Sequence, residues 1–91
     1  MYSNDFKQSI ELVVMTNKEL ILMKLAERIT EVRKEKGMSI HGLANSADIE
    51  YSLVQRVEKG KVNLSFCTLV AITRGLNMDF DELMKGLKFP Q

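Results

Sequence analysis

The sequence has one cysteine, one histidine and no tryptophan among its 91 residues. A single thiol excludes an internal disulfide framework and a cysteine-rich zinc site, and it is typical of proteins kept in a reducing compartment. One histidine leaves a metal ion without its usual companion ligands. We therefore expect no metal and no cofactor, and a cytoplasmic location is the simplest expectation.

Long apolar runs and catalytic patterns are also lacking. Asn17, Lys18 and Glu19 interrupt the only stretch hydrophobic enough to be considered as a membrane span, and the sequence predicts neither export nor a span. There is no phosphate-gripping glycine loop, no metal-ligand spacing, and no nucleophile with an identifiable base and orienting partner. These absences predict that the chain is not an enzyme.

The chain has no strong excess of positive charge, because 13 Lys and Arg residues stand against 12 Asp and Glu residues, a net charge of +1. Nonspecific DNA affinity comes largely from phosphate neutralisation. A near-neutral chain that binds DNA must therefore gather its cations on one face or bind as a dimer. The length and a hydrophobic content of 45% predict one small domain with a single core.

What the sequence does contain is a series of local helix signals. Thr16, with Glu19 three residues later, predicts a capping box that opens a helix extending to Lys36. Its inner stripe is Leu22, Leu25, Ile29 and Val32. Gly37 predicts a left-handed helix end, and Ser39 predicts the N-cap of the next helix.

Two further helices are predicted in the last third of the chain. Ser65 predicts the cap of a helix that ends at Asn77, with the inward stripe Phe66, Leu69, Val70, Thr73 and Leu76. Asp79 and Glu82 predict a capping box for a last helix limited by Pro90, whose inward residues are Phe80, Leu83, Met84 and Leu87. The prediction is an all-α chain of five helices, each of roughly 8 to 20 residues.

The most informative stretch, residues 39–60, holds two short helical patterns a few residues apart. The first has apolar residues at i, i+3, i+4 and i+7, namely Ile40, Leu43, Ala44 and Ala47. The second has a narrow apolar seam of Leu53, Val54 and Val57. Opposite that seam lie Tyr51, Ser52, Gln55, Arg56 and Lys59. This is the layout of a DNA-reading helix-turn-helix.

Residues 25–87 resemble the Cro and phage-repressor type of helix-turn-helix domain, also called the Xre-like family. The resemblance predicts a DNA-binding domain over residues 25–88. The resemblance rests on an ordered set with the family's spacing: Ile29 through Arg33, Gly37, Leu43, Ala44, Val54, Val57, Glu58, Gly60, Asn63, Ser65, Leu69, Leu76 and Leu83. It implies a compact five-helix, lambda-repressor-like fold and a bacterial or phage transcriptional regulator. Such a regulator places the third helix of the domain in the major groove of double-stranded DNA.

The resemblance also implies roles for single residues. Base readout falls to Tyr51, Ser52, Gln55 and Arg56. Arg56 suits guanine O6 and N7, Gln55 suits adenine, and Tyr51 suits a thymine methyl or a phosphate. The family commonly holds the DNA backbone at the positions of Ser39, Lys59, Lys61 and Asn63. His41 is expected to face solvent or touch a phosphate.

Other polar residues receive structural interpretations. Arg33 and Glu58 resemble an ion pair that ties the first helix of the domain to the reading helix. Cys67 is expected at a semi-buried helix position. The acidic residues near the last helix indicate charge at a helix N-terminus rather than a calcium loop: Asp79, Asp81 and Glu82.

Three positions depart from the family pattern. Ile40 stands where Gln is frequent, and Asp48 stands in the turn where Gly is frequent. Asp tolerates the left-handed conformation better than most residues do. Glu50 replaces the usual Ser or Thr cap of the reading helix. DNA would therefore approach near two carboxylates.

Residues 1–24 fall outside the resemblance and are predicted to form an N-terminal extension. Phe6, Ile10, Val13 and Val14 have helical spacing, but the run Ile10–Met15 is also β-branched enough for a strand. One hypothesis is that this arm builds or extends a dimer interface. Another is that Met15 is the natural start and the preceding residues are loosely ordered.

Function is interpreted in two ways. The preferred interpretation is a sequence-specific regulator, a repressor, bound as a homodimer to an inverted repeat with half-sites about 34 Å apart. The alternative is a protein-interaction module of the same fold, similar to a coactivator. An antitoxin role is also open. The sequence specifies no operator and no small-molecule effector.

Overall fold

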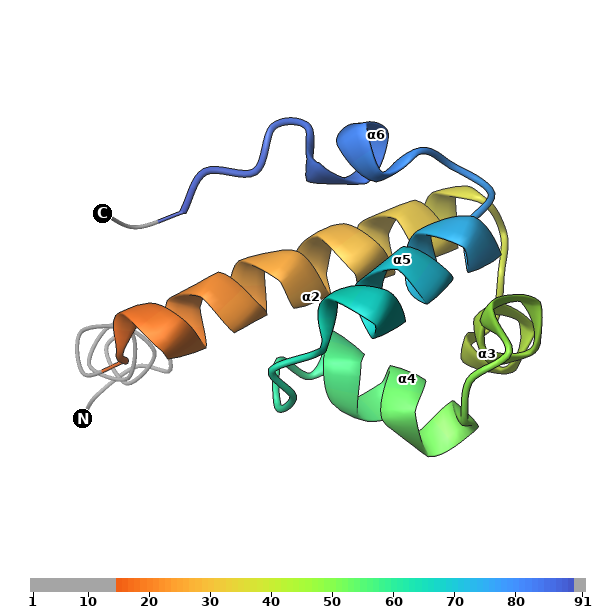
Figure 1. The fold of residues 1–91 in the computed structure, drawn as a ribbon, viewed down its shortest axis with the longest axis horizontal. Coiled ribbons are helices and arrows are strands. Elements are labelled where there is room, and N and C mark those ends of the chain that lie inside the picture. Colours follow the sequence, from red (N-terminus) through yellow and green to blue (C-terminus); the bar gives the residue numbers. More distant parts are fainter. Residues whose placement is uncertain (1–14, 90–91) are drawn as a thin grey trace, which may run out of the picture.

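The structure, a computed structural model, describes residues 15–89, which form five α-helices and no strand (Figure 1). In chain order the helices are α2 (Asn17–Glu35), α3 (Ile40–Ala47), α4 (Tyr51–Glu58), α5 (Phe66–Gly75) and α6 (Phe80–Met84). The all-α prediction is confirmed. The long helix α2 has α4 on one side and α6 with the C-terminal segment on the other (Figure 1). Among residues 15–89, no helix combines the length and apolar character that crossing a membrane requires.

Hydroxyl side chains begin three of the helices, as predicted. The first N–H groups of a helix have no partner within it, and an N-cap oxygen accepts a hydrogen bond from one of them. Thr16 Oγ1 accepts from Glu19 N at 3.1 Å, and Ser39 Oγ accepts from Gly42 N at 2.9 Å. Ser65 Oγ accepts from Thr68 N at 3.1 Å.

Four helices end in the same way, with one residue in the left-handed conformation. These residues are Gly37, Asp48, Gly60 and Asn77, with φ of 69°, 56°, 71° and 55°. In each case the next residue donates its N–H back into the last turn, as in the bond from Ile49 N to Ala44 O at 3.0 Å. This geometry ends each helix and directs the chain away from the helix axis toward the next helix.

Every helix contributes side chains to one core. Its buried members are Leu25, Ile29, Val32, Leu43, Ala44, Ala47, Val54, Val57, Ile72, Leu76 and Leu83. The helices α3 and α5 pack closely together, because a Cβ added to Gly75 would lie only 2.7 Å from Ala47 Cβ. Leu22, predicted in the inner stripe of α2, is only half-buried.

The prediction for α5 is wrong at its first turn. Phe66 is 67% exposed, whereas Ile72, absent from the predicted stripe, is fully buried. Phe66 directly follows the N-cap Ser65, and its ring meets that of Phe80 with centroids 5.5 Å apart. Cys67 is exposed rather than semi-buried.

The prediction for the last helix is wrong in length and in its cap. α6 has five residues, and Asp79 makes no side-chain capping bond. Lys85 adopts an extended conformation and Gly86 has φ of 83°, so the helix ends well before Pro90, which lies outside the described residues. Of the predicted inward residues, Leu83 is buried and Phe80, Met84 and Leu87 are half-buried.

The predicted boundary between residues 24 and 25 falls inside α2, which is continuous across it. Residues 1–14, including the predicted amphipathic positions Phe6, Ile10, Val13 and Val14, lie outside the described residues. The division of the chain into an extension and a DNA-binding domain stays a prediction.

Candidate nucleic-acid interface

The site is built on α3, a three-residue turn and α4. Asp48 ends α3 in the left-handed conformation, half-buried Ile49 packs against the core, and Glu50 is extended. Left-handed backbone costs Asp less than most residues, so this chain forms the turn without glycine. Glu50 precedes α4 but its side chain makes no capping bond.

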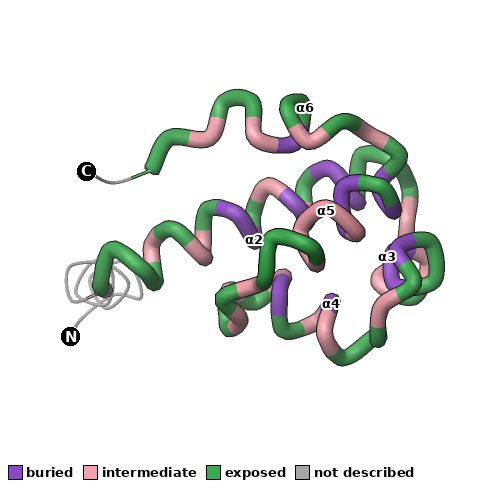
Figure 2. The backbone as a smooth tube through the Cα atoms, viewed as in Figure 1, coloured by how far each residue is buried: buried purple, intermediate pink, exposed green. Residues whose placement is uncertain are grey.

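One side of α4 is anchored in the core and the other is open. Val54 and Val57 are 0% and 2% exposed. Ser52, Arg56 and Lys59 are exposed, and Tyr51 is exposed by 36%. Buried and exposed positions are interspersed along α4 (Figure 2). Gln55 is half-buried. The projecting side of α4 thus carries hydroxyl, amide and guanidinium groups, which form hydrogen bonds with base edges and phosphates.

An ion pair fixes the C-terminal end of α4 to α2. Arg33 Nε donates to Glu58 Oε2 at 2.7 Å, and Arg33 Nη2 donates to Glu58 Oε1 at 2.9 Å. Thr30 Oγ1 also donates to Glu58 Oε1, at 2.9 Å, and Arg33 Nη1 donates to Met38 O at 2.8 Å. Both side chains of the pair are at most 10% exposed. Their geometry is bidentate and buried, so their charges point into the protein rather than toward a ligand.

The start of α4 is held by a stack across the turn. The rings of His41 on α3 and Tyr51 on α4 lie face to face, with centroids 3.9 Å apart and planes inclined by 17°. The hydroxyl of Tyr51 in turn accepts a hydrogen bond from Gln55 Nε2 at 3.2 Å. Residues ten positions apart in sequence gave no signal of this contact.

The residues predicted to hold DNA phosphates flank α4. Ser39 and His41 lie at the start of α3, where His41 stacks on Tyr51. Exposed Lys59, Lys61 and Asn63 follow the other end of α4. Ser39 uses an oxygen lone pair in its helix cap. Its O–H remains a donor, since a hydroxyl both accepts and donates.

The charges near α4 are of both signs. Asp48 and Glu50 are exposed at its N-terminal end, and Arg56, Lys59 and Lys61 are exposed toward its C-terminal end. Within residues 15–89 the ion pairs are Arg28–Glu31 and Arg33–Glu58. Neither ion pair includes Arg56, Lys59 or Lys61.

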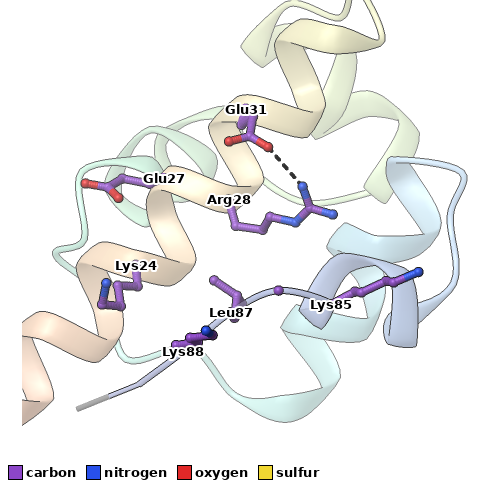
Figure 3. Close-up of a pocket in the computed structure, with 8 residues that line it drawn as sticks. Lys24, Glu27, Arg28, Glu31, Lys85, Leu87 and Lys88 are labelled. Atoms are coloured by element: carbon purple, nitrogen blue, oxygen red, sulfur yellow. Dashed lines mark hydrogen bonds and ion pairs between the residues drawn. The ribbon is translucent and has the colours of Figure 1, made fainter.

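A cavity of about 500 Å³ lies elsewhere, between α2 and the segment after α6. Its lining includes Lys24, Arg28, Lys85 and Lys88 (Figure 3). Arg28 reaches across to α6 and donates to the carbonyl oxygens of Leu83 and Glu82 at 2.8 and 2.9 Å. Arg28 therefore ties α6 to α2, a role that the sequence did not indicate. In the described part of the chain, no three His, Cys, Asp or Glu residues are grouped as metal ligands.

Comparison with known proteins assigns the class. A model of the helix-turn-helix family named HTH_3 matches residues 29–83, from the middle of α2 into α6. The chain therefore belongs to this helix-turn-helix family, as the sequence resemblance predicted. It is not a family of enzymes.

Individual relatives agree with this assignment. The HTH-type transcriptional regulator DdrOP3 of Deinococcus deserti is 31% identical over 67 residues, which cover 74% of this chain and 52% of the relative. The chain thus spans about half the length of this curated relative. The restriction-modification controller protein C.AhdI of Aeromonas hydrophila is structurally similar, with a TM-score of 0.66, 32% identity, and coverage of 68% of this chain and 94% of that one. The controller protein C.Esp1396I is similar with a TM-score of 0.69, 26% identity, and coverage of 71% and 83%.

Proposed function

We propose that this chain is a sequence-specific DNA-binding transcription regulator that places α4 in the major groove. The observation that carries the proposal is the open side of α4, held rigid from beneath by Val54, Val57 and the Arg33–Glu58 pair. A major groove admits an α-helix, and base edges present acceptors and donors to side chains that project from it. Named relatives that are transcriptional regulators or controller proteins support the same function.

Within that function, base readout belongs to Tyr51, Ser52, Gln55 and Arg56. Arg56 forks to guanine O6 and N7, and each such bidentate contact discriminates by roughly 1–3 kcal/mol. Phosphate contacts come from Ser39, His41, Lys59, Lys61 and Asn63, which fix the register without reading sequence. The ring of His41 is stacked by its face on Tyr51, so the nitrogen atoms at its edge are left for a phosphate.

The regulator acts as a repressor in the cytoplasm and binds an inverted repeat as a homodimer. Two observations support the dimer, and the symmetry of an inverted repeat agrees with it. The net charge is only +1, so one copy neutralises few phosphates. Phe66 is 67% exposed and continues into Phe80, which forms an apolar surface of the kind that associates in water. Two copies related by a twofold axis would present two α4 helices to half-sites about 34 Å apart.

Salt dependence tests the function. A duplex enriched from a random pool should bind the protein far more tightly than random duplex does. Its affinity should fall by orders of magnitude between 50 and 200 mM salt, because phosphate contacts release counterions. A protein that enriches no sequence, and whose weak binding is the same for every duplex, would contradict this function and favour the protein-interaction module.

A further inference from the structure

We propose that His41 is a positioning residue for base recognition, which sets the preference of Gln55 for adenine without touching a base. The inference rests on the proposed DNA-binding function and adds a specificity determinant outside the reading helix. Its basis is the continuous contact from the His41 ring to the Tyr51 ring and from the Tyr51 hydroxyl to the Gln55 amide.

The first link is the stack. Tyr51 is the first residue of α4 and is 36% exposed, a place where an aromatic side chain would otherwise exchange between rotamers. His41 covers one face of its ring at a centroid distance of 3.9 Å, in a nearly parallel arrangement. Because His41 belongs to α3, the stack bridges the two helices of the motif. It therefore fixes where the Tyr51 hydroxyl lies relative to the whole domain.

The second link is the hydrogen bond to Gln55. A primary amide has two N–H donors and one carbonyl acceptor. One N–H of Gln55 is donated to Tyr51 at 3.2 Å, which leaves one donor and the acceptor Oε1. Adenine offers N7 as an acceptor and its N6 amino group as a donor, the complementary pair. If the amide were rotated so that Oε1 accepted from the Tyr51 hydroxyl, both N–H groups of Gln55 would be free to donate. Two donors suit the acceptors O6 and N7 of guanine.

Tyr51 suits a phosphate as well as a thymine methyl, and a phosphate contact fixes the direction of its bond with Gln55. When the Tyr51 O–H donates to a phosphate, its oxygen is free only to accept, and Gln55 must present N–H to it. The ring of His41 holds Tyr51 in place for both bonds. The stack and the bond between Gln55 and Tyr51 exist before DNA arrives, and the phosphate contact then keeps the amide in the orientation that favours adenine over guanine.

The stack is tested first without DNA. His41 is the single histidine of the chain, so its ring protons give isolated NMR signals. We expect these signals to be shifted upfield by the Tyr51 ring current and to return to ordinary positions in Tyr51→Leu. Signals that are unshifted in the wild-type protein would overturn the proposal.

Base preference is tested next by selection from a random duplex pool. Gln55→Ala identifies the base position read by Gln55. At that position the preference for adenine over guanine should fall about tenfold in His41→Ala and in Tyr51→Phe, a loss within the range of one bidentate contact. His41→Phe keeps a flat ring on Tyr51 and should retain the preference within about twofold. The matched control is Asn45→Ala, an exposed change one turn further along α3, which should leave the preference unaltered.

The outcomes separate this inference from the function on which it rests. A wild-type protein that enriches no sequence overturns both. A wild-type protein that enriches one sequence, with an unchanged preference in folded His41→Ala, overturns the role of His41 alone. So does a failure of His41→Phe to restore the preference, because the stack would then not be the cause.

Discussion

The guanidinium of Arg33 on α2 and the carboxylate of Glu58 on α4 form a two-point contact, with Nε to Oε2 at 2.7 Å and Nη2 to Oε1 at 2.9 Å. Removing one partner of a buried pair leaves an uncompensated charge. We expect Glu58→Ala to lower the free energy of unfolding by about 3–5 kcal/mol, measured by urea titration. Glu31→Ala, which breaks a pair whose carboxylate side chain is 59% exposed, should cost less than about 1 kcal/mol.

If Glu58 instead contacted DNA, Glu58→Ala would keep its melting temperature and lose DNA binding. That pattern would reverse the structural interpretation of the pair. Where Glu58→Ala is too unstable to study, Glu58→Gln retains the shape of the side chain. It should also lose more stability than DNA binding, with a smaller loss than in Glu58→Ala.

The contact between α3 and α5 leaves no space for a side chain at Gly75. An added Cβ would lie 2.7 Å from Ala47 Cβ and 2.9 Å from the Ala47 backbone. Alanine is a better helix former than glycine by about 1 kcal/mol, yet overpacking costs roughly 1–3 kcal/mol. Gly75→Ala should therefore destabilise the domain in thermal unfolding. An increase in stability would mean that the two helices separate freely.

Addition of Ala47→Gly to Gly75→Ala should recover part of the loss, because it removes the Cβ of residue 47, the nearest of the three clashing atoms. The backbone of residue 47 remains close, so recovery should be incomplete. Strict additivity of the two single changes would argue against a direct contact.

Asp48 places a carboxylate near the N-terminal end of α4, the helix that we propose to lie in the major groove. Asp48→Asn removes this charge and keeps a residue type that tolerates φ of 56°. We expect DNA affinity at low salt to rise roughly threefold, with little change in stability. At low salt the Debye length is long, so the carboxylate of Asp48 repels nearby phosphates with little screening. Asp81→Asn, an exposed change on α6, is the control of equal charge. An equal rise in both variants would assign the effect to net charge rather than to position.

The exposed ring of Phe66 and the half-buried ring of Phe80 form the surface that we propose to associate in the dimer. Phe66→Ala should raise the dimer dissociation constant at least tenfold in sedimentation equilibrium and should leave the melting temperature of the monomer nearly unchanged, since the ring is 67% exposed. Deletion of residues 1–14 tests the other hypothesis. A dimer lost in the deletion and kept in Phe66→Ala would move the interface to the N-terminal arm.

The sequence predicted best what depends on neighbours in the chain. A hydroxyl side chain three residues before a free N–H group caps the start of a helix. A glycine or asparagine that adopts the left-handed conformation ends a helix. Ser39, Ser65, Gly37 and Asn77 are accordingly where they were expected. The apolar seam of α4 was predicted for the same reason, since its period is local.

The errors concern contacts between distant residues. The burial of Phe66 depends on whether another element covers the first turn of α5, and none within residues 15–89 does so fully. The length of α6 is limited by Gly86 and its end is held by Arg28 from α2, neither of which periodicity reveals. The stack of His41 on Tyr51 was missed because a turn separates the two residues.

The most direct test of the account is selection of bound duplexes from a random pool with the wild-type protein, Arg56→Ala and Lys85→Ala. Arg56 is an exposed residue of α4, whereas Lys85 directly follows α6. The helices α4 and α6 lie on opposite sides of α2 (Figure 1). We expect a palindrome for the wild-type protein and for Lys85→Ala, and the same palindrome with one guanine position relaxed for Arg56→Ala. Identical palindromes from all three proteins, or none from the wild-type protein, would contradict this expectation.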